Sequence, residues 1–106
     1  GADTCFSENN TGDDIGFLSY LQDFIDKRKK EMPGGSYTTS LFEEGVAKIS
    51  QKVGEEAVEL IIEAKGTDRQ LLFNEAADLV YHLLVMLVYK GYSLQDVVRV
   101  LEERHQ

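Results

Sequence analysis

Four stretches of the chain repeat apolar residues every three or four positions, the spacing that places them on one face of an α-helix. They cover about residues 15–31, 46–65, 68–90 and 94–104. No segment alternates apolar and polar residues as a half-buried β-strand does, and the chain contains one proline. The pattern therefore predicts an all-α fold with four main helices.

Capping and turn residues separate these helices. Gly66 and Gly91 follow the second and third helices, where glycine commonly ends a helix. The residues expected to cap helix N-termini are Asp13 or Asp14 for the first, Thr67 with Gln70 for the third, and Ser93 with Asp96 for the fourth. Residues 36–40 are predicted to form a hydroxyl-rich loop that leads into a short helical turn at 41–44.

Two polar clusters before the second helix each allow two interpretations. The hydroxyl groups of Ser36, Tyr37 and Thr38 either cap a helix or bind the phosphate oxygens of a ligand. The basic run at 27–30 either complements the dipole of the first helix in solvent or contacts a phosphate. The pattern leaves both choices open.

The second helix is apolar on two sides. One face consists of Val46, Ile49, Val53, Ala57, Leu60, Ile61 and Ala64. On a wheel of about 100° per residue, Val58 and Ile62 lie nearly opposite that face. Such a helix is predicted to lie between neighbours, and a chain of 106 residues has few helices to supply them, so we expect a homodimer. The third helix, apolar nearly all round from 76 to 89, should be the most buried.

Carboxylates interrupt the most apolar parts of the second and third helices. Glu56 and Glu59 are three residues apart, as are Glu75 and Asp78, so each pair shares a helix face. The short connection at 64–67 predicts antiparallel neighbours, which brings the two pairs together. Ionised groups in such surroundings cost several kcal/mol unless they are compensated. We therefore predict that all four carboxylates bind Mg²⁺ or Mn²⁺.

Three residues flank the predicted metal site. Glu55 and Glu63 are candidates for a base or an additional ligand, and Glu55 is the preferred base, with Glu56 as the other catalytic carboxylate. His82, one turn beyond Asp78, is either a core histidine with satisfied hydrogen bonds or a group that contacts substrate or supports a ligand. A di-iron centre would require Glu-x-x-His pairs, which are absent at these positions.

A hard divalent cation held by carboxylates is typical of phosphoanhydride hydrolysis. Lys48 and Lys52 lie on the same stripe of the second helix and are predicted to hold phosphate oxygens. The sequence contains no Walker loop and no Gly-rich dinucleotide motif. Its formal net charge of −8 argues against nucleic acid or an anionic membrane as the partner. The residues alone predict a metal-dependent all-α hydrolase of a phosphorylated ligand.

The cysteine content and the hydropathy of the chain indicate its cellular compartment. Cys5 is the single cysteine, which excludes an intramolecular disulfide and favours a reducing compartment. The N-terminal residues show no signal-peptide pattern, and the longest apolar run, 83–89, is much shorter than a membrane span. We therefore expect a cytoplasmic protein.

The segments around the carboxylates resemble a known family. Glu55-Glu56-x-x-Glu59, followed after fifteen residues by Glu75-x-x-Asp78, is similar to the motif of the MazG-like all-α nucleotide pyrophosphohydrolases, which include dimeric dUTPase. Gly35-Ser36-Tyr37-Thr38, Lys52-Val53-Gly54-Glu55-Glu56-Ala57 and Glu75-Ala76-Ala77-Asp78-Leu79-Val80-Tyr81-His82 resemble phosphoribosyl-ATP pyrophosphohydrolase. The resemblance covers about 18–103.

The resemblance implies Mg²⁺-dependent cleavage of phosphoribosyl-ATP to phosphoribosyl-AMP and pyrophosphate, the second step of histidine biosynthesis. It also implies a MazG-like helical bundle that is completed by homodimerisation. The implied metal ligands are Glu56, Glu59, Glu75 and Asp78, and the implied substrate contacts are Ser36, Tyr37, Thr38, Lys48, Lys52 and His82. The alternative functions are a house-cleaning pyrophosphohydrolase of (d)NTPs and a non-catalytic dimerisation domain.

Residues 1–14 are interpreted as a linker that precedes the domain at 15–106. Asp3-Thr4-Cys5-Phe6 resembles the end of phosphoribosyl-AMP cyclohydrolase, whose terminal cysteine is a zinc ligand. The chain would then be the C-terminal domain of a bifunctional protein, and Cys5 would be a zinc ligand separated from its site. An ordinary linker cysteine is the alternative.

Overall fold

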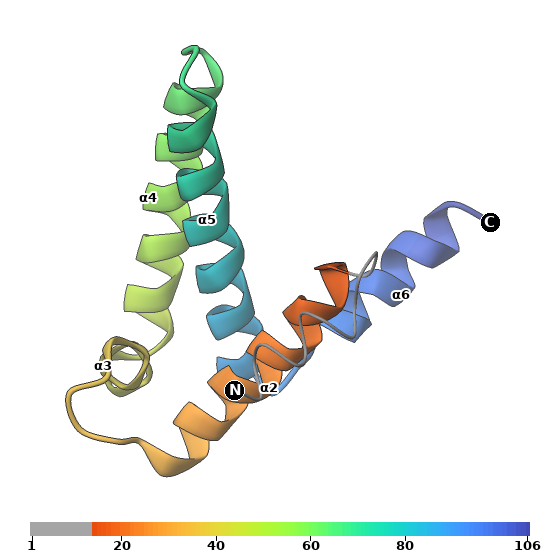
Figure 1. Cartoon of the computed structure of the whole chain (residues 1–106). Coiled ribbons are helices and arrows are strands. Elements are labelled where there is room, and N and C mark those ends of the chain that lie inside the picture. The colour runs from red at the N-terminus through yellow and green to blue at the C-terminus, as the bar shows by residue number, and fades with distance from the viewer. Residues whose placement is uncertain (1–13) are drawn as a thin grey trace.

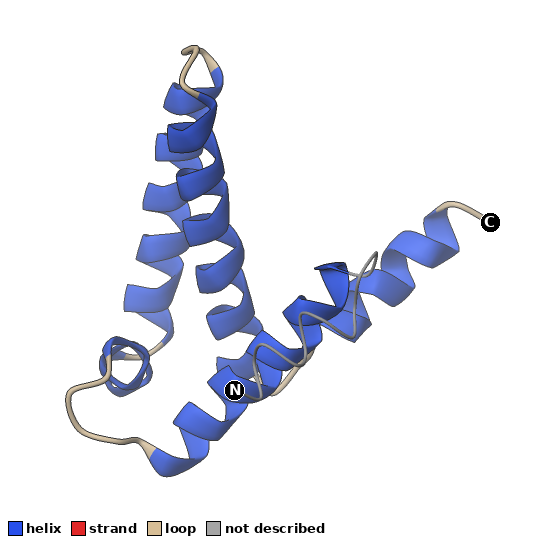
Figure 2. Ribbon diagram, in the orientation of Figure 1, coloured by secondary structure: helices blue, strands red, loops and turns tan. Residues whose placement is uncertain are grey.

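The computed structural model describes residues 14–106, whose regular elements are all helices (Figures 1 and 2). The elements are η1 (Asp14–Gly16), α2 (Phe17–Glu31), α3 (Tyr37–Glu44), α4 (Val46–Ala64), α5 (Arg69–Tyr89) and α6 (Leu94–Arg104). No strand occurs between residues 14 and 106, which confirms the all-α prediction. The four predicted main helices are α2, α4, α5 and α6, and α3 is a fifth, shorter one. Cys5 and nearly all of the predicted linker lie outside the described residues.

The helices α4 and α5 form a long antiparallel hairpin, and α2 crosses its open end (Figure 1). The short helix α3 packs on α4 and α2 at the same end. The last helix, α6, points away from the hairpin past the start of α2. As the short connection predicts, α4 and α5 are neighbours along their length. This arrangement places their carboxylates face to face, with α3 nearby.

The core lies at the open end of the hairpin. Its fully buried side chains come from four helices and are Ile25, Leu41, Ile49, Leu84 and Val85. Each helix turns one apolar face toward this centre, as its i, i+3/i+4 spacing requires. All buried residues of α5 lie in its second half, whereas Leu71 and Phe73 in its first half are exposed. The prediction that this is the most buried helix is therefore wrong, because α5 has four buried residues among its 21, as many as α3 has among its 8.

The apolar sides of α4 are more open than predicted. Of the predicted main face, all of it in the described range, only Ile49 is buried, while Val46 is 42% and Ile61 56% exposed. Val58 and Ile62 on the opposite side are also exposed. The reason is geometric, because beyond the core α5 is the one helix among residues 14–106 that lies beside α4.

The length and composition of α5 alone would allow this helix to span a membrane. Here it packs along α4 and supplies Leu84, Val85 and Val88 to the core, as the apolar central helix of a globular fold does. Glu75 and Asp78 in its first half interrupt the apolar surface. Packing therefore accounts for the apolar residues of its second half, whereas Leu71 and Phe73 in its first half stay exposed.

Two helix starts differ from the prediction. Gly16 precedes α2, and no side-chain hydrogen bond among the described residues caps that helix, so Asp14 is not its cap. Asp68 rather than Thr67 caps α5, because its Oδ1 accepts hydrogen bonds from the backbone N–H groups of Gln70 and Leu71. Asp68 and Thr67 are both good capping residues, and a shift of one position selects between them.

The predicted hydroxyl loop is helical. Ser36 is the N-cap of α3, and its Oγ accepts a hydrogen bond from the N–H of Thr39, so residues 37–40 form the first turn of that helix. The capping interpretation of Ser36 is thereby confirmed, and the loop prediction is wrong. The capping box of Ser93 and Asp96 at the start of α6 is confirmed.

The basic run at the end of α2 stabilises the fold. Lys29 Nζ donates hydrogen bonds to the carbonyl oxygens of Val88 at 3.0 Å and Tyr89 at 3.3 Å, at the C-terminus of α5. The guanidinium carbon of Arg28 lies 4.6 Å from the centroid of the Phe24 ring. These contacts favour a structural role for the run over the phosphate contact left open by the sequence.

Replacing Lys29 by methionine is expected to destabilise the fold by about 1–3 kcal/mol, because two carbonyl oxygens lose a charged donor. Lys30→Met is the matched control, since Lys30 forms an exposed ion pair with Asp26 at 3.0 Å. A pair of that kind contributes at most about 0.5 kcal/mol. Urea denaturation measures both variants, and equal stabilities would contradict the role of Lys29.

Candidate metal and substrate site

Three carboxylates meet between α4 and α5. One oxygen atom from each of Glu56, Glu75 and Asp78 lies within 4.8 Å of the other two. Glu56 is buried, Glu75 half-buried and Asp78 exposed, so the cluster lies at the edge of the contact between the helices. The antiparallel turn and the i, i+3 spacing on α5 produce this arrangement. Three of the four predicted metal ligands are thus brought together.

Glu75 shows the electrostatic cost of this cluster. Its Oε1 atom is buried and has no hydrogen-bond partner among the described residues. Burial raises the pKa of Glu75, and the neighbouring carboxylates of Glu59, Asp78 and Glu56 raise it further. A buried carboxylate oxygen without a donor is stabilised by a proton, a cation or a bound water molecule. The three carboxylates therefore fit a divalent cation that prefers oxygen ligands.

Glu59, the fourth predicted ligand, lies apart from the cluster. Its side chain is exposed and lines an open hollow on the outer face of α4 with Gln51, Gly54, Glu55 and Val58. Its charge nevertheless contributes to the raised pKa of Glu75. The spacing of the motif places Glu59 on the correct helix, but its carboxylate does not belong to the group whose oxygen atoms lie within 4.8 Å of one another, and its role as a ligand stays a prediction.

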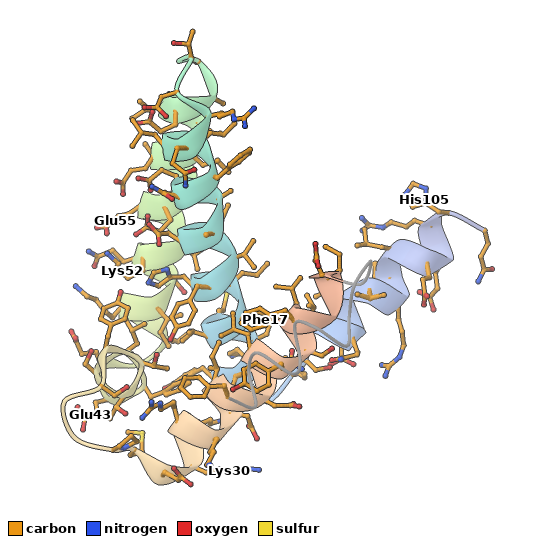
Figure 3. All side chains as sticks on the ribbon, in the orientation of Figure 1. Phe17, Lys30, Glu43, Lys52, Glu55 and His105 are labelled. Carbon is orange, nitrogen blue, oxygen red and sulfur yellow. The ribbon has the colours of Figure 1, made fainter. Side chains whose placement is uncertain are left out.

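Lys52 lies between Glu55 and the cluster. Lys52 Nζ is 3.3 Å from Oε1 of Glu55 and 3.6 Å from Oε2 of Glu56. Figure 3 labels Lys52 and Glu55, both on α4. Gln51 Nε2 donates a hydrogen bond to the other Glu55 oxygen at 2.8 Å. The hydrogen bonds from Gln51 and Lys52 lower the pKa of Glu55. A carboxylate with a lowered pKa is a weaker base, so the geometry does not favour Glu55 as the base, and that role stays a prediction.

The predicted phosphate-binding lysines both lie on α4. Burial alone would lower the pKa of Lys52, but its hydrogen bond with Glu55 and the neighbouring Tyr37, Glu55 and Glu56 raise that pKa overall. Lys52 therefore keeps a positive charge beside the carboxylates. Lys48 is half-buried one turn earlier, and its charge helps to lower the pKa of Glu55. The stripe predicted from the sequence is present in the fold.

The start of α3 places hydroxyl groups against α5. The Tyr37 hydroxyl oxygen lies 2.8 Å from Nε2 of His82, and Thr38 Oγ1 forms a hydrogen bond with the hydroxyl group of Tyr81. Thr38 is buried and Ser36 caps the helix, whereas Tyr37 is 52% exposed. Of the three predicted substrate contacts in this segment, Tyr37 is therefore the one that is best placed to reach a ligand.

His82 is a core histidine whose ring nitrogens both have partners. The ring is buried, and Nδ1 lies 2.7 Å from the backbone carbonyl oxygen of Asp78. Nε2 faces the Tyr37 hydroxyl group, as described above. The interpretation of His82 as a core histidine with satisfied hydrogen bonds is therefore confirmed, and a role in contacting substrate or supporting a ligand stays a prediction.

Two contacts at the site were not predicted. Tyr81 follows Asp78 by three residues on α5 and forms a hydrogen bond with Thr38. Gln51 precedes Glu55 by four residues on α4 and donates to it. Each lies three or four residues from a predicted residue, and that spacing is the sequence signal that could have identified them.

Comparison with known families covers most of the chain. The family description "Phosphoribosyl-ATP pyrophosphohydrolase" matches residues 18–105. The chain belongs to the phosphoribosyl-ATP pyrophosphohydrolase family. The part that matches this family includes α3, α4 and α5, and with them every residue of the site described above.

Relatives of the phosphoribosyl-ATP pyrophosphohydrolase domain include long and short proteins. The chain is 59% identical over 105 residues to the histidine biosynthesis bifunctional protein HisIE of Bacteroides thetaiotaomicron. This alignment covers 99% of the chain and 51% of HisIE. It is 50% identical over 109 residues to HisIE of Bacillus subtilis, with 99% and 52% covered. A phosphoribosyl-ATP pyrophosphatase of Leptospira biflexa is 49% identical over 89 residues, with 84% and 97% covered. The chain thus spans about half the length of the bifunctional relatives.

Proposed function

We propose that this domain hydrolyses phosphoribosyl-ATP to phosphoribosyl-AMP and pyrophosphate, the second step of histidine biosynthesis. The observation that carries the proposal is the cluster of Glu56, Glu75 and Asp78 beside Lys52, in a chain of this family. In the reaction, the oxygen of water bonds to a phosphorus atom of the α–β anhydride while the bridging P–O bond breaks. The proton of the water passes to a base or to solvent.

The residues of the site would bind either the metal ion or the phosphate oxygens of the substrate. Glu56, Glu75 and Asp78, with Glu59 as the proposed fourth ligand, would hold Mg²⁺ or Mn²⁺. A divalent cation there would neutralise charge on the phosphate oxygens. Lys52 and Lys48 would bind phosphate oxygens along the same stripe of α4. The orphaned Oε1 atom of Glu75 supports this assignment, because a cation would satisfy it.

Incubation of the protein with phosphoribosyl-ATP and Mg²⁺ tests this function through the release of pyrophosphate. A panel of ATP, dUTP and the other dNTPs at equal concentration provides the comparison. We expect the highest kcat/KM for phosphoribosyl-ATP. A higher value for a free (d)NTP would contradict the proposal in favour of a house-cleaning pyrophosphohydrolase. No turnover of any nucleotide would favour a non-catalytic dimerisation domain.

We also propose a homodimer, in which a second copy of this chain covers the exposed apolar side chains of the hairpin. Val58, Ile61, Ile62 and Phe73 are 55–59% exposed on α4 and α5. Removing such side chains from water contributes roughly 1.5–3 kcal/mol each when burial is complete. Ile62→Asp should convert the dimer to a monomer in sedimentation measurements. A wild-type protein that sediments as a monomer at micromolar concentration would overturn the proposal.

The full-length protein is proposed to carry a phosphoribosyl-AMP cyclohydrolase domain before residue 14 and to be cytoplasmic. The bifunctional relatives, about half of whose length is matched by this chain, support the first part. A tryptic map of the natural protein would test it, because a chain of about the present length would exclude a preceding domain.

A further inference from the structure

The ammonium group of Lys52 lies between two carboxylates of the same helix. Its Nζ atom is 3.3 Å from Oε1 of Glu55 and 3.6 Å from Oε2 of Glu56. Glu56 is buried and belongs to the carboxylate cluster, whereas 46% of the Glu55 side chain is exposed. The two carboxylates therefore share one ammonium group, and of the two Glu56 alone belongs to the proposed metal site.

Both oxygen atoms of Glu55 are bound by side chains of the preceding turn. Gln51 Nε2 donates a hydrogen bond to Oε2 at 2.8 Å, while Lys52 pairs with Oε1. Gln51 and Lys52 precede Glu55 by four and three residues, the spacings at which side chains of one helix meet. Glu55 is thereby kept in the position from which it attracts Lys52.

Lys52 and a divalent cation would compete for Glu56. Without a cation, the ammonium group compensates part of the charge of this buried carboxylate. The Coulomb energy of an ion pair increases as its atoms approach, so an ammonium group closer to Glu56 would weaken the binding of a cation there. A second carboxylate that attracts the ammonium group opposes this approach.

We propose that Glu55, held by Gln51, is a positioning residue that draws Lys52 away from Glu56 and so leaves the buried carboxylate available to a divalent cation. Lys52 stays beside the cluster, where it can bind a phosphate oxygen. This role differs from that of a base or a metal ligand, because Glu55 acts through Lys52. The inference rests on the metal site of the proposed function.

The test measures the dissociation constant of Mn²⁺ without substrate, from the electron paramagnetic resonance signal of the free ion. Glu55→Gln should weaken Mn²⁺ binding about fivefold, an effect of the size expected between interacting neighbours. Lys52→Met provides the background in which the ammonium group is absent. In that background, Glu55→Gln should change the dissociation constant less than about twofold, because the group through which Glu55 acts is gone.

Gln51→Leu makes the same comparison without a change of net charge. It removes the donor to Oε2 of Glu55 and should weaken Mn²⁺ binding about two- to threefold, but not in Lys52→Met. Gln70→Leu is the matched control, because Gln70 Nε2 donates to Asn74 Oδ1 at 3.0 Å with the same spacing on α5. Equal dissociation constants for the two leucine variants would overturn the role of Gln51.

The outcomes separate this inference from the proposed function. An equal loss of affinity from Glu55→Gln with and without Lys52 would overturn the inference, because Glu55 would then act on the cation directly. An unchanged affinity in Glu55→Gln would also overturn it and would leave the proposed metal site intact. A wild-type protein that binds no Mn²⁺ would overturn the metal site and this inference together.

Discussion

Replacing Glu56 by glutamine is expected to lower kcat for pyrophosphate release by about 10³-fold. Glu56 is the buried member of the carboxylate cluster and lies 3.6 Å from Lys52. A neutral amide would remove a proposed metal ligand, and metal assistance supplies several kcal/mol of transition-state stabilisation. Each 1.4 kcal/mol changes the rate about tenfold. Steady-state release of pyrophosphate at saturating Mg²⁺ measures the loss.

Two further variants make this result specific. Glu102→Gln removes the same charge from an exposed position on α6 and should leave kcat unchanged. Glu55→Gln should lower kcat less than Glu56→Gln, because Glu55 is held by Gln51 and Lys52 outside the cluster. Equal losses in the two α4 variants would restore Glu55 as the candidate base. Undiminished turnover of phosphoribosyl-ATP by Glu56→Gln would contradict the assignment of Glu56 to the catalytic metal site.

Replacing Glu75 by glutamine should raise the melting temperature of the metal-free protein and abolish the rise that Mg²⁺ causes. The pKa of Glu75 is raised by burial and by Glu59, Asp78 and Glu56, so the folded protein binds its proton more tightly than the unfolded chain does. Its contribution to stability is therefore complete below the ordinary glutamate pKa and is lost as the pH rises through the raised value. Glutamine removes this loss at neutral pH.

Melting curves between pH 4 and pH 8, in EDTA or in Mg²⁺, measure both effects. In EDTA, the melting temperature of the wild-type protein should decrease relative to that of Glu75→Gln as the pH rises. A ligand at about 100 times its Kd adds about 2.7 kcal/mol. For a domain of this size that corresponds to a rise on the order of 10 °C. A wild-type protein without any such rise in Mg²⁺ would favour the non-catalytic alternative.

The carboxylate pairs were predictable because their geometry is local. Spacing of three residues places Glu75 and Asp78 on one side of α5, and the short turn after α4 brings Glu56 opposite them. The capping box of Ser93 and Asp96 is local in the same way. Each of these features depends on residues a few positions apart or on one tight connection, which periodicity and turn chemistry specify.

The helical turn at 41–44 was predicted, but the start of α3 at 37–40 was missed because packing overrides local preference there. Its first turn is rich in hydroxyl side chains, which are weak helix formers and compete for backbone hydrogen bonds. Burial of Thr38, Thr39, Leu41 and Phe42 against the other helices stabilises the helical conformation. That contribution comes from residues distant in the chain, so it cannot be recognised from the local sequence pattern of apolar and polar residues.

The sequence by itself determined the all-α class, the extents of the long helices and the presence of acidic pairs on two neighbouring helices. The tertiary structure alone decided which side chains meet. Glu59 lies outside the cluster, Lys29 binds carbonyl oxygens of α5, and Tyr37 meets His82 across 45 positions of sequence. The physical reason is that helical period sets the face on which a residue lies, whereas the partner of a polar group and the direction of its hydrogen bond depend on what another helix places beside it.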